Sequence, residues 1–164
     1  MKRRILTLLL ALAMVLTMLP VTALAADGDV AEVNDQGYST LQAAIEAAQN
    51  EGTVKLLADV AEDVTIPSGA AITLDLNGHK LVNSTDAQND TVPDAKRKHT
   101  ITNNGTLTIT GNGTVDNVSH FRAAVKNNVG GTVTIENGTF SRSAEASTDA
   151  DHNGGNSYYV IDNQ

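Results

Sequence analysis

The sequence predicts an all-β fold, a parallel β-helix (solenoid) closed at its N-terminal end by one short α-helix. The first observation is a sequence pattern that occurs twice between Ile101 and Phe140. It consists of a β-branched residue, an Asn pair, a Gly, an alternating strand and an Asn-Gly turn. Repetition at a fixed period is the signature of stacked structural units. The second is a single amphipathic helical segment ahead of the strands. The third is that Val, Ile, Leu and Ala must fill the core, because only 3% of the residues are aromatic. Small aliphatic side chains suit the thin stacked layers of a solenoid.

The repeat has the length of one β-helix coil. Ile101 recurs as Val125, 24 residues later, and each repeat holds two or three short strands separated by Asn/Gly corners. A hairpin meander would instead join neighbouring strands by two-residue turns. We expect roughly four or five coils, with Leu107 directly beside Val133 in parallel strands. Sequence alignment also predicts one inward column of side chains: Leu76, Ile109 and Ile135.

Residues 1–25 predict a secretory signal peptide. A basic start, an apolar run from Ile5 to Leu19 and the small-residue site Ala23-Leu24-Ala25 follow each other, as in peptides removed on export. An uncleaved membrane anchor is the alternative, but the apolar run is shorter than the roughly 20 residues a bilayer needs. Cleavage after Ala25 and after Ala26 both fit. The expected location is therefore extracellular.

The acidic composition limits the classes of molecule that the protein is expected to bind. The net charge is −8, and losing residues 1–25 removes three positive charges more. An acidic surface argues against nucleic acid and anionic membranes as partners; it is compatible with sugars or cations. There is no cysteine, so one secreted domain must be held by its core and by backbone hydrogen bonds.

Residues 26–38 are a polar lead-in, and residues 39–52 predict the capping helix. Ser39 followed by Gln42 fits a capping box, and apolar residues recur at helical spacing over 39–50. So short a helix cannot stand alone, so we expect it to cover the open end of the stack. Docking on a partner protein is the alternative. The apolar positions are Leu41, Ala44, Ile45 and Ala48.

Residues 53–164 predict the coils, with loop insertions at 83–98 and 141–157. Strands are expected at 53–57, 64–66 and 71–76, the last with Ile72, Leu74 and Leu76 inward. The basic cluster Lys96-Arg97-Lys98 ends the first insertion. It is interpreted as a solvated loop tip or as a contact for an acidic polysaccharide. The segment 161–164 begins another repeat, which indicates an N-terminal fragment truncated inside a coil, or an end covered by another protein.

Asparagine pairs mark the predicted corners. Stacked amides can hydrogen-bond in a ladder along the coil axis, and Asn tolerates the left-handed backbone of tight turns. We therefore predict a structural role for them. The residues are Asn103, Asn104, Asn127, Asn128 and Asn163.

One segment resembles a metal loop. Asp149, Asp151 and Asn153, followed by Gly154, copy the opening of a calcium-binding loop, but the twelfth position is Val160 instead of Glu. A weak calcium site and a plain polar loop both remain open, and no other cofactor is expected. The histidines show no metal spacing; His79 and His99 are expected at half-exposed corners.

No catalytic group emerges from the sequence. Glycosidic-bond hydrolysis usually needs two carboxylates about 5–10 Å apart, and the predicted register places Thr108 and Thr134 beside Asp75. No nucleophile elbow, phosphate loop or zinc-protease motif is present. Catalytic residues are therefore predicted to be none.

The phrases G-Y-S-T-L-Q-A-A-I-E-A-A, V-K-L-L-A-D-V, I-T-L-D-L-N-G-H-K-L and H-T-I-T-N-N-G-T-L-T-I-T cover most of residues 37–164. Together they resemble secreted right-handed parallel β-helix surface proteins of Firmicutes with a pectate-lyase-like fold. The resemblance implies right-handed coils, an N-terminal helical cap and surface modules or further coils downstream. Most members of that group have no assigned activity.

Two functions are therefore weighed. The favoured one is a non-catalytic secreted or cell-surface domain for adhesion or for contact with glycans or a host. It rests on outer faces of Thr and Asn without acid–base clusters. The alternative is a polysaccharide lyase or glycoside hydrolase whose active face lies in a C-terminal part beyond Gln164; the resemblance alone carries it. We expect no nucleic-acid partner and no membrane attachment after signal cleavage, unless a region beyond Gln164 anchors the chain to the cell surface.

Overall fold

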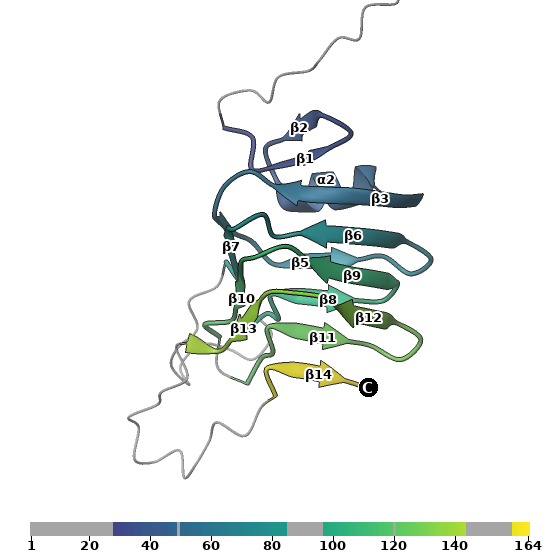
Figure 1. Cartoon of the computed structure of the whole chain (residues 1–164). Helices are drawn as coiled ribbons and strands as arrows, with labels where there is room; N and C mark the ends of the chain where they lie inside the picture. The colour runs from purple at the N-terminus through teal and green to yellow at the C-terminus, as the bar shows by residue number, and fades with distance from the viewer. Residues whose placement is uncertain (1–27, 49, 85–96, 120, 144–158) are drawn as a thin grey trace, which may run out of the picture.

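The computed structural model describes residues 28–48, 50–84, 97–119, 121–143 and 159–164. These form a column of coils with the N-terminal elements at one end and β14 at the other (Figure 1). The predicted signal peptide and most of the two insertions lie outside the described residues. Among the described residues, no helix has the length and hydrophobicity to cross a membrane.

Three parallel sheets make up the walls of the column, and each coil contributes one strand to each sheet. Four coils are described, formed in turn by β3–β5, β6–β8, β9–β11 and β12–β14. The first sheet contains β3 (Asn50–Leu56), β6 (Ala71–Asp75), β9 (Thr106–Thr110) and β12 (Thr132–Ile135). The second contains β4 (Val60–Ala61), β7 (Lys80–Val82), β10 (Thr114–Asp116) and β13 (Thr139–Ser141). The third contains β5 (Val64–Ile66), β8 (Ile101–Asn103), β11 (Val125–Asn127) and β14 (Ile161–Asn163).

The predicted fold class is confirmed, because the strands of successive coils pair in parallel. Leu107 of β9 lies opposite Val133 of β12. Short strands separated by left-handed corner residues, such as Asn77 at φ 47° and Gly78 at φ 85°, turn the chain from one sheet to the next. Asn and Gly adopt this backbone at little cost.

The predicted inward column was wrong by two residues in its first member. Leu74, not Leu76, lies opposite Ile109, and Ile109 lies opposite Ile135. Asp75 consequently neighbours Thr110 instead of Thr108. The alternation of the strand allows a shift of two residues without moving any side chain to the other face, so the hydrophobic pattern could not detect it.

The core is a stack of aliphatic tiers inside the column. Alternate strand residues, for example Val54, Leu74 and Leu107, are fully buried, as the period of two requires. Leu76 is also fully buried at the following corner. In the last described coil the tier is less covered, and Ile135 is 40% exposed.

The helix α2 (Leu41–Ala47) covers the N-terminal end with its apolar face, and Leu41, Ala44 and Ile45 are fully buried. It stands where a strand of the third sheet would precede β3. The Gln42 side chain imitates that strand: its Oε1 accepts from Thr65 N–H at 2.8 Å, and its Nε2 donates to Thr65 O at 3.2 Å. These two hydrogen bonds, together with the buried apolar face, support the predicted role of the helix in covering the end of the stack.

The predicted capping box was wrong, and the helix is shorter than the predicted 39–50. Thr40 is the N-cap, and its hydroxyl accepts from Ala43 N–H at 3.2 Å. Glu62 accepts from the Leu41 and Gln42 N–H groups at 2.8 and 3.0 Å. A carboxylate at this place also complements the helix dipole. The helix start is therefore capped by Thr40 instead of Ser39, and by Glu62 from the first coil.

A short antiparallel hairpin extends the first sheet at the same end. It comprises β1 (Ala31–Val33) and β2 (Gln36–Tyr38), and β1 also pairs antiparallel with β3. Its turn places Asn34 and Asp35 at φ 49° and 63°, as two-residue hairpins require. The predicted lead-in is therefore part of the fold.

Candidate functional site

Two asparagine ladders tie the coils together where the third sheet ends. Asn103 Nδ2 donates to Asn127 Oδ1, and Asn127 Nδ2 donates to Asn163 Oδ1, each at 2.7 Å. Beside them, Asn128 Nδ2 donates to Asn104 Oδ1 at 2.7 Å. Asn103 is fully buried and Asn127 nearly so, so these amides satisfy one another out of reach of water. The predicted ladder is confirmed, and we assign it a structural role.

The outer face of the first sheet carries a column of threonines. Thr53, Thr73, Thr108 and Thr134 are in register across the four coils. The neighbouring column places Asp75 between Lys55 and Thr110. Within these described strands the face therefore offers hydroxyl and methyl groups and no carboxylate pair on adjacent rungs.

The second sheet holds a buried carboxylate that the sequence did not single out. Asp116 of β10 is 1% exposed, and its Oδ2 lies 2.8 Å from the Nζ atom of Lys80 on the preceding coil. The Ser141 and Ser143 hydroxyls donate to it at 2.8 and 2.5 Å, and Ser143 N–H donates at 2.9 Å. These four residues, the Asp116 cluster, join three successive coils.

The chemistry of the Asp116 cluster is that of a structural tie. Burial by itself would raise the pKa of Asp116, but the hydrogen bonds from Lys80, Ser143 and Ser141 outweigh it and lower the pKa to about 2. A carboxylate with so low a pKa is a poor general base near neutral pH, so it does not activate either serine as a nucleophile.

The depressed pKa predicts an acid-sensitive contribution to stability. The unfolded pKa of an aspartate is about 3.9, so the stabilisation is complete above roughly pH 4 and is lost as the pH falls towards 2. Replacing Asp116 with Asn should lower the free energy of unfolding by about 2 kcal/mol at pH 7, since Lys80 loses its charged partner. Urea unfolding of both proteins between pH 2 and 7 measures this.

The free energies of unfolding of the wild-type and Asp116→Asn proteins should converge as the pH approaches 2, because the wild-type carboxylate then loses the charge that the amide lacks at every pH. A constant difference between the proteins across this window would contradict the assignment. Lys55→Gln serves as the control, because the Lys55–Glu32 pair is exposed to solvent on the Lys55 side and such pairs contribute little.

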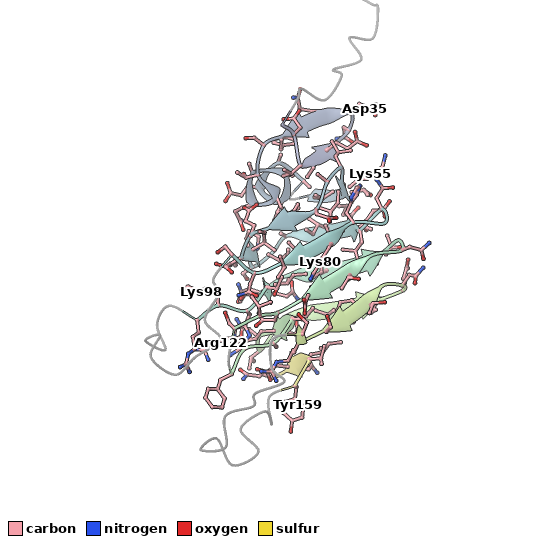
Figure 2. All side chains as sticks on the ribbon, turned by 90° about the vertical axis from the view of Figure 1, so that its left-hand side faces the viewer. Asp35, Lys55, Lys80, Lys98, Arg122 and Tyr159 are labelled. Carbon is pink, nitrogen blue, oxygen red and sulfur yellow. The ribbon has the colours of Figure 1, made fainter. Side chains whose placement is uncertain are left out.

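Cations gather at the corner between the second and third sheets, and Figure 2 shows two of them, Lys98 and Arg122, on the same side of the column. We call Arg97, Lys98, Arg122 and Arg142 the basic corner. Arg122 Nε donates to Arg97 O at 3.2 Å, and Arg142 Nε donates to Arg122 O at 2.8 Å. Each of these two arginines therefore reaches back to the coil before it. Lys98 is exposed, and Arg122 and Arg142 are half-buried.

Arg97 has a different environment from its neighbours. It is 8% exposed, and its guanidinium carbon lies 5.6 Å from the centre of the Phe121 ring, within cation–π range. Phe121 itself has φ 55°, which is rare for a bulky residue. The interpretation of Arg97 as part of a solvated loop tip was therefore wrong; Lys96 lies outside the described residues.

His99 lies half-buried beside the basic corner. Burial is the largest cause that lowers the pKa of His99 to about 4; the nearby cations Arg122 and Lys126 act in the same direction, and Asp162 opposes them. Its Nδ1 accepts from Ala123 N–H at 2.9 Å, which fits the neutral ring. Half-burial of His99 and His79 agrees with the sequence expectation.

The weak calcium-loop residues Asp149, Asp151 and Asn153 lie outside the described residues, so that prediction stays untested. Within the part of the chain that the structure describes, no three His, Asp or Glu side chains are grouped as metal ligands would be.

A signal for the basic corner was present in the sequence. Lys98 and Arg122 each stand three residues before a matching strand start, Ile101 and Val125. They occupy equivalent positions of the repeat, and parallel register stacks such positions on adjacent coils. Arg142 carried no such signal, because its partner Arg122 occupies a different position of the repeat. Asp116 faces Ser141 in register, but its other partners, Lys80 and Ser143, come from non-equivalent positions.

Comparison of the chain with protein-family models, with curated proteins and with solved structures found no match. The fold assignment therefore rests on the strand pairing described above, and the similarity to pectate-lyase-like surface proteins of Firmicutes stays a prediction from sequence phrases.

Proposed function

We propose that this chain is a non-catalytic, secreted or cell-surface β-solenoid domain that binds acidic glycans through the basic corner. The supporting observation is the placement of one cation on each of three successive coils: the exposed Lys98 and the half-buried Arg122 and Arg142. In a chain with a net charge of −8, such local concentration of positive charge favours an anionic ligand.

Two features support binding over catalysis. The buried carboxylate Asp116 is held ionised by hydrogen bonds, and the outer face of the first sheet presents threonines. The predicted signal peptide supports an extracellular location, as does the resemblance to pectate-lyase-like proteins of Firmicutes. Nucleic acid shares the required negative charge, but the acidic composition outside the basic corner disfavours it.

The test uses residues 26–164 with a panel of acidic and neutral polysaccharides, with and without calcium. We expect acidic polymers to bind without turnover and neutral polymers to bind at least about tenfold more weakly, because only the former engage the guanidinium groups. Binding is measured by calorimetry, and turnover by unsaturated products and new reducing ends. Either kind of product would overturn the non-catalytic assignment in favour of a lyase or hydrolase, and equal binding of neutral polymers would overturn the role of the corner.

A further inference from the structure

An asparagine followed by a glycine can lose its amide group without an enzyme. The backbone nitrogen of the glycine gives up its proton and attacks the Cγ atom of the asparagine, the bond from Cγ to Nδ2 breaks, and ammonia leaves. Water then opens the resulting succinimide ring at either carbonyl, which gives aspartate or isoaspartate. The reaction consumes water and releases ammonia. Glycine favours it, because no Cβ atom hinders the approach of its nitrogen.

Four Asn-Gly pairs lie within the described residues, and each stands at a corner that follows a strand. The two residues are the same in every pair, so the fold determines how the pairs differ in reactivity. A reaction within the chain requires the two reacting atoms to lie close together and to be free to approach each other. The pairs are Asn77-Gly78, Asn104-Gly105, Asn112-Gly113 and Asn137-Gly138.

In Asn77-Gly78 both reacting groups are engaged by other coils. Asn77 Nδ2 donates to Leu56 O at 2.8 Å, and Gly78 N–H donates to the backbone carbonyl of Asn112. These hydrogen bonds hold the glycine nitrogen and the side-chain amide to opposite neighbours. We therefore expect this pair to react slowly.

Asn104-Gly105 is held in a similar way and is less accessible to water. Gly105 is buried, and its N–H donates to Asn103 Oδ1 at 3.2 Å. The Asn104 side chain accepts from Asn128 Nδ2 at 2.7 Å and donates to Ile66 O at 3.3 Å. The amide therefore cannot turn towards the glycine nitrogen without breaking hydrogen bonds to both neighbouring coils.

Asn112-Gly113 is restrained by the packing of its backbone. The backbone carbonyl of Asn112 accepts from Gly78 N–H. A Cβ atom at Gly113 would lie 2.5 Å from His79 O, so this glycine is packed closely against the preceding coil. Movement of the corner is restricted, although Asn112 itself is exposed.

The fourth pair has its reacting groups in contact. Gly138 N–H donates to Asn137 Oδ1 at 2.8 Å, so the nitrogen lies against the amide that it would attack, and Asn137 is exposed to water. On either side, Glu136 N–H and Thr139 N–H donate to carbonyls of the preceding coil at 2.9 and 2.8 Å. The corner is therefore anchored at both ends, with the reactive pair between the anchors.

We propose that Asn137 is a site of spontaneous deamidation, and that it reacts faster than the other three described Asn-Gly pairs. The contact between Gly138 N and the Asn137 side chain brings the reacting groups together before the reaction starts. The bond from Asn137 Nδ2 to Asn112 Oδ1 opposes rotation of the amide, but it is exposed, so water replaces it at little cost.

The product changes this corner in two ways. A carboxylate at position 137 has no donor for Asn112 Oδ1, so the Asn112 amide must turn and donate through its own Nδ2. Isoaspartate also adds a carbon atom to the main chain just before β13. Because Ser141 of β13 donates to Asp116, we expect this form to weaken the Asp116 cluster.

The experiment incubates residues 26–164 at mildly alkaline pH, both folded and in urea, and follows each pair by peptide mass spectrometry. In the folded protein, Asn137 should be converted roughly tenfold faster than the other three described pairs. In urea the four rates should be similar, because the fold no longer distinguishes the pairs. The fifth pair, Asn153-Gly154, lies outside the described residues and is followed separately.

Two variants and one purified product complete the test. Asn137→Gln keeps an amide but would need a larger ring, so conversion at position 137 should stop while the other pairs react as before. Asn137→Asp provides the aspartate product as a standard. The isoaspartate form, separated by ion exchange, should unfold a few degrees below Asn137→Asp in a thermal scan.

Two results would overturn the proposal. One is a rate at Asn137 in the folded protein that does not exceed the rates at Asn77, Asn104 and Asn112. The other is an unchanged Asn137 in the folded protein under conditions in which the urea-unfolded chain is converted. Glycan binding at the basic corner does not enter this test, so either proposal can fail alone.

Discussion

Replacing Asn103 with leucine is expected to lower the free energy of unfolding by about 3 kcal/mol or more, one of the two largest effects predicted for this chain. Leucine has a similar size, so the loss comes from polar groups. The Asn103 amide donates to Gly105 O, Asn127 Oδ1 and Thr132 O and accepts from Gly105 N–H. Removing it takes the partner from Asn127 Oδ1 and from Gly105 N–H, and a buried group costs about 1–3 kcal/mol when unsatisfied.

Asn137→Ala is the matched control. Asn137 Nδ2 donates to Asn112 Oδ1 at 3.0 Å in an exposed ladder of the same kind. Water replaces that hydrogen bond, so the expected loss is about 0.5 kcal/mol. Urea titration with a common slope for all three proteins measures both changes. Similar losses at the two sites would show that burial of the amide does not determine its contribution.

Gly105→Ala is expected to destabilise the protein by about 2–4 kcal/mol through overpacking. A Cβ atom at this position would lie 2.5 Å from the carbonyl oxygens of Ala70 and Pro67. Both oxygens belong to the backbone of the preceding coil, so neither can rotate away. Thr132 N–H donates to Gly105 O at 2.8 Å from the following coil, which restricts movement in the other direction.

Gly130→Ala separates crowding from backbone conformation. Gly130 has φ 86° and no atom within 4 Å of an added Cβ, so only the left-handed backbone is penalised, at about 1 kcal/mol. Differential scanning calorimetry of the two variants gives the comparison. A Gly105→Ala protein as stable as Gly130→Ala would mean that the coils separate without cost at this corner.

The architecture could be predicted because it is written in local repetition. The Asn pairs, the alternating apolar residues and the Gly corners each recur at the coil period, and parallel stacking follows from that recurrence. Leu107 and Val133 pair as expected. The exact register was harder, since a shift of two residues keeps Leu74 and Leu76 on the same face.

Contacts between non-equivalent positions could not be predicted. Besides the local cap Thr40, the helix N-terminus is satisfied by Glu62 from the first coil, and sequence reasoning can search only for nearby caps. Lys80 and Asp116 meet because register places β7 beside β10. The basic corner could be predicted in part, because Lys98 and Arg122 occupy equivalent positions of the sequence repeat. The hydrogen bonds that hold its arginines depend on three-dimensional packing and could not be predicted.

A helix stands where the first strand of the third sheet would lie, so coils can stack on only one end of the solenoid. Gln42 occupies the Thr65 backbone groups that another chain would need for edge-to-edge pairing, and β4 at the same end of the second sheet has two residues. Sheet edges blunted in these ways resist polymerisation. During synthesis the N-terminal coil emerges first, so it can serve as the template on which the next coil pairs. Coils are then added in one direction, away from the end that the helix covers.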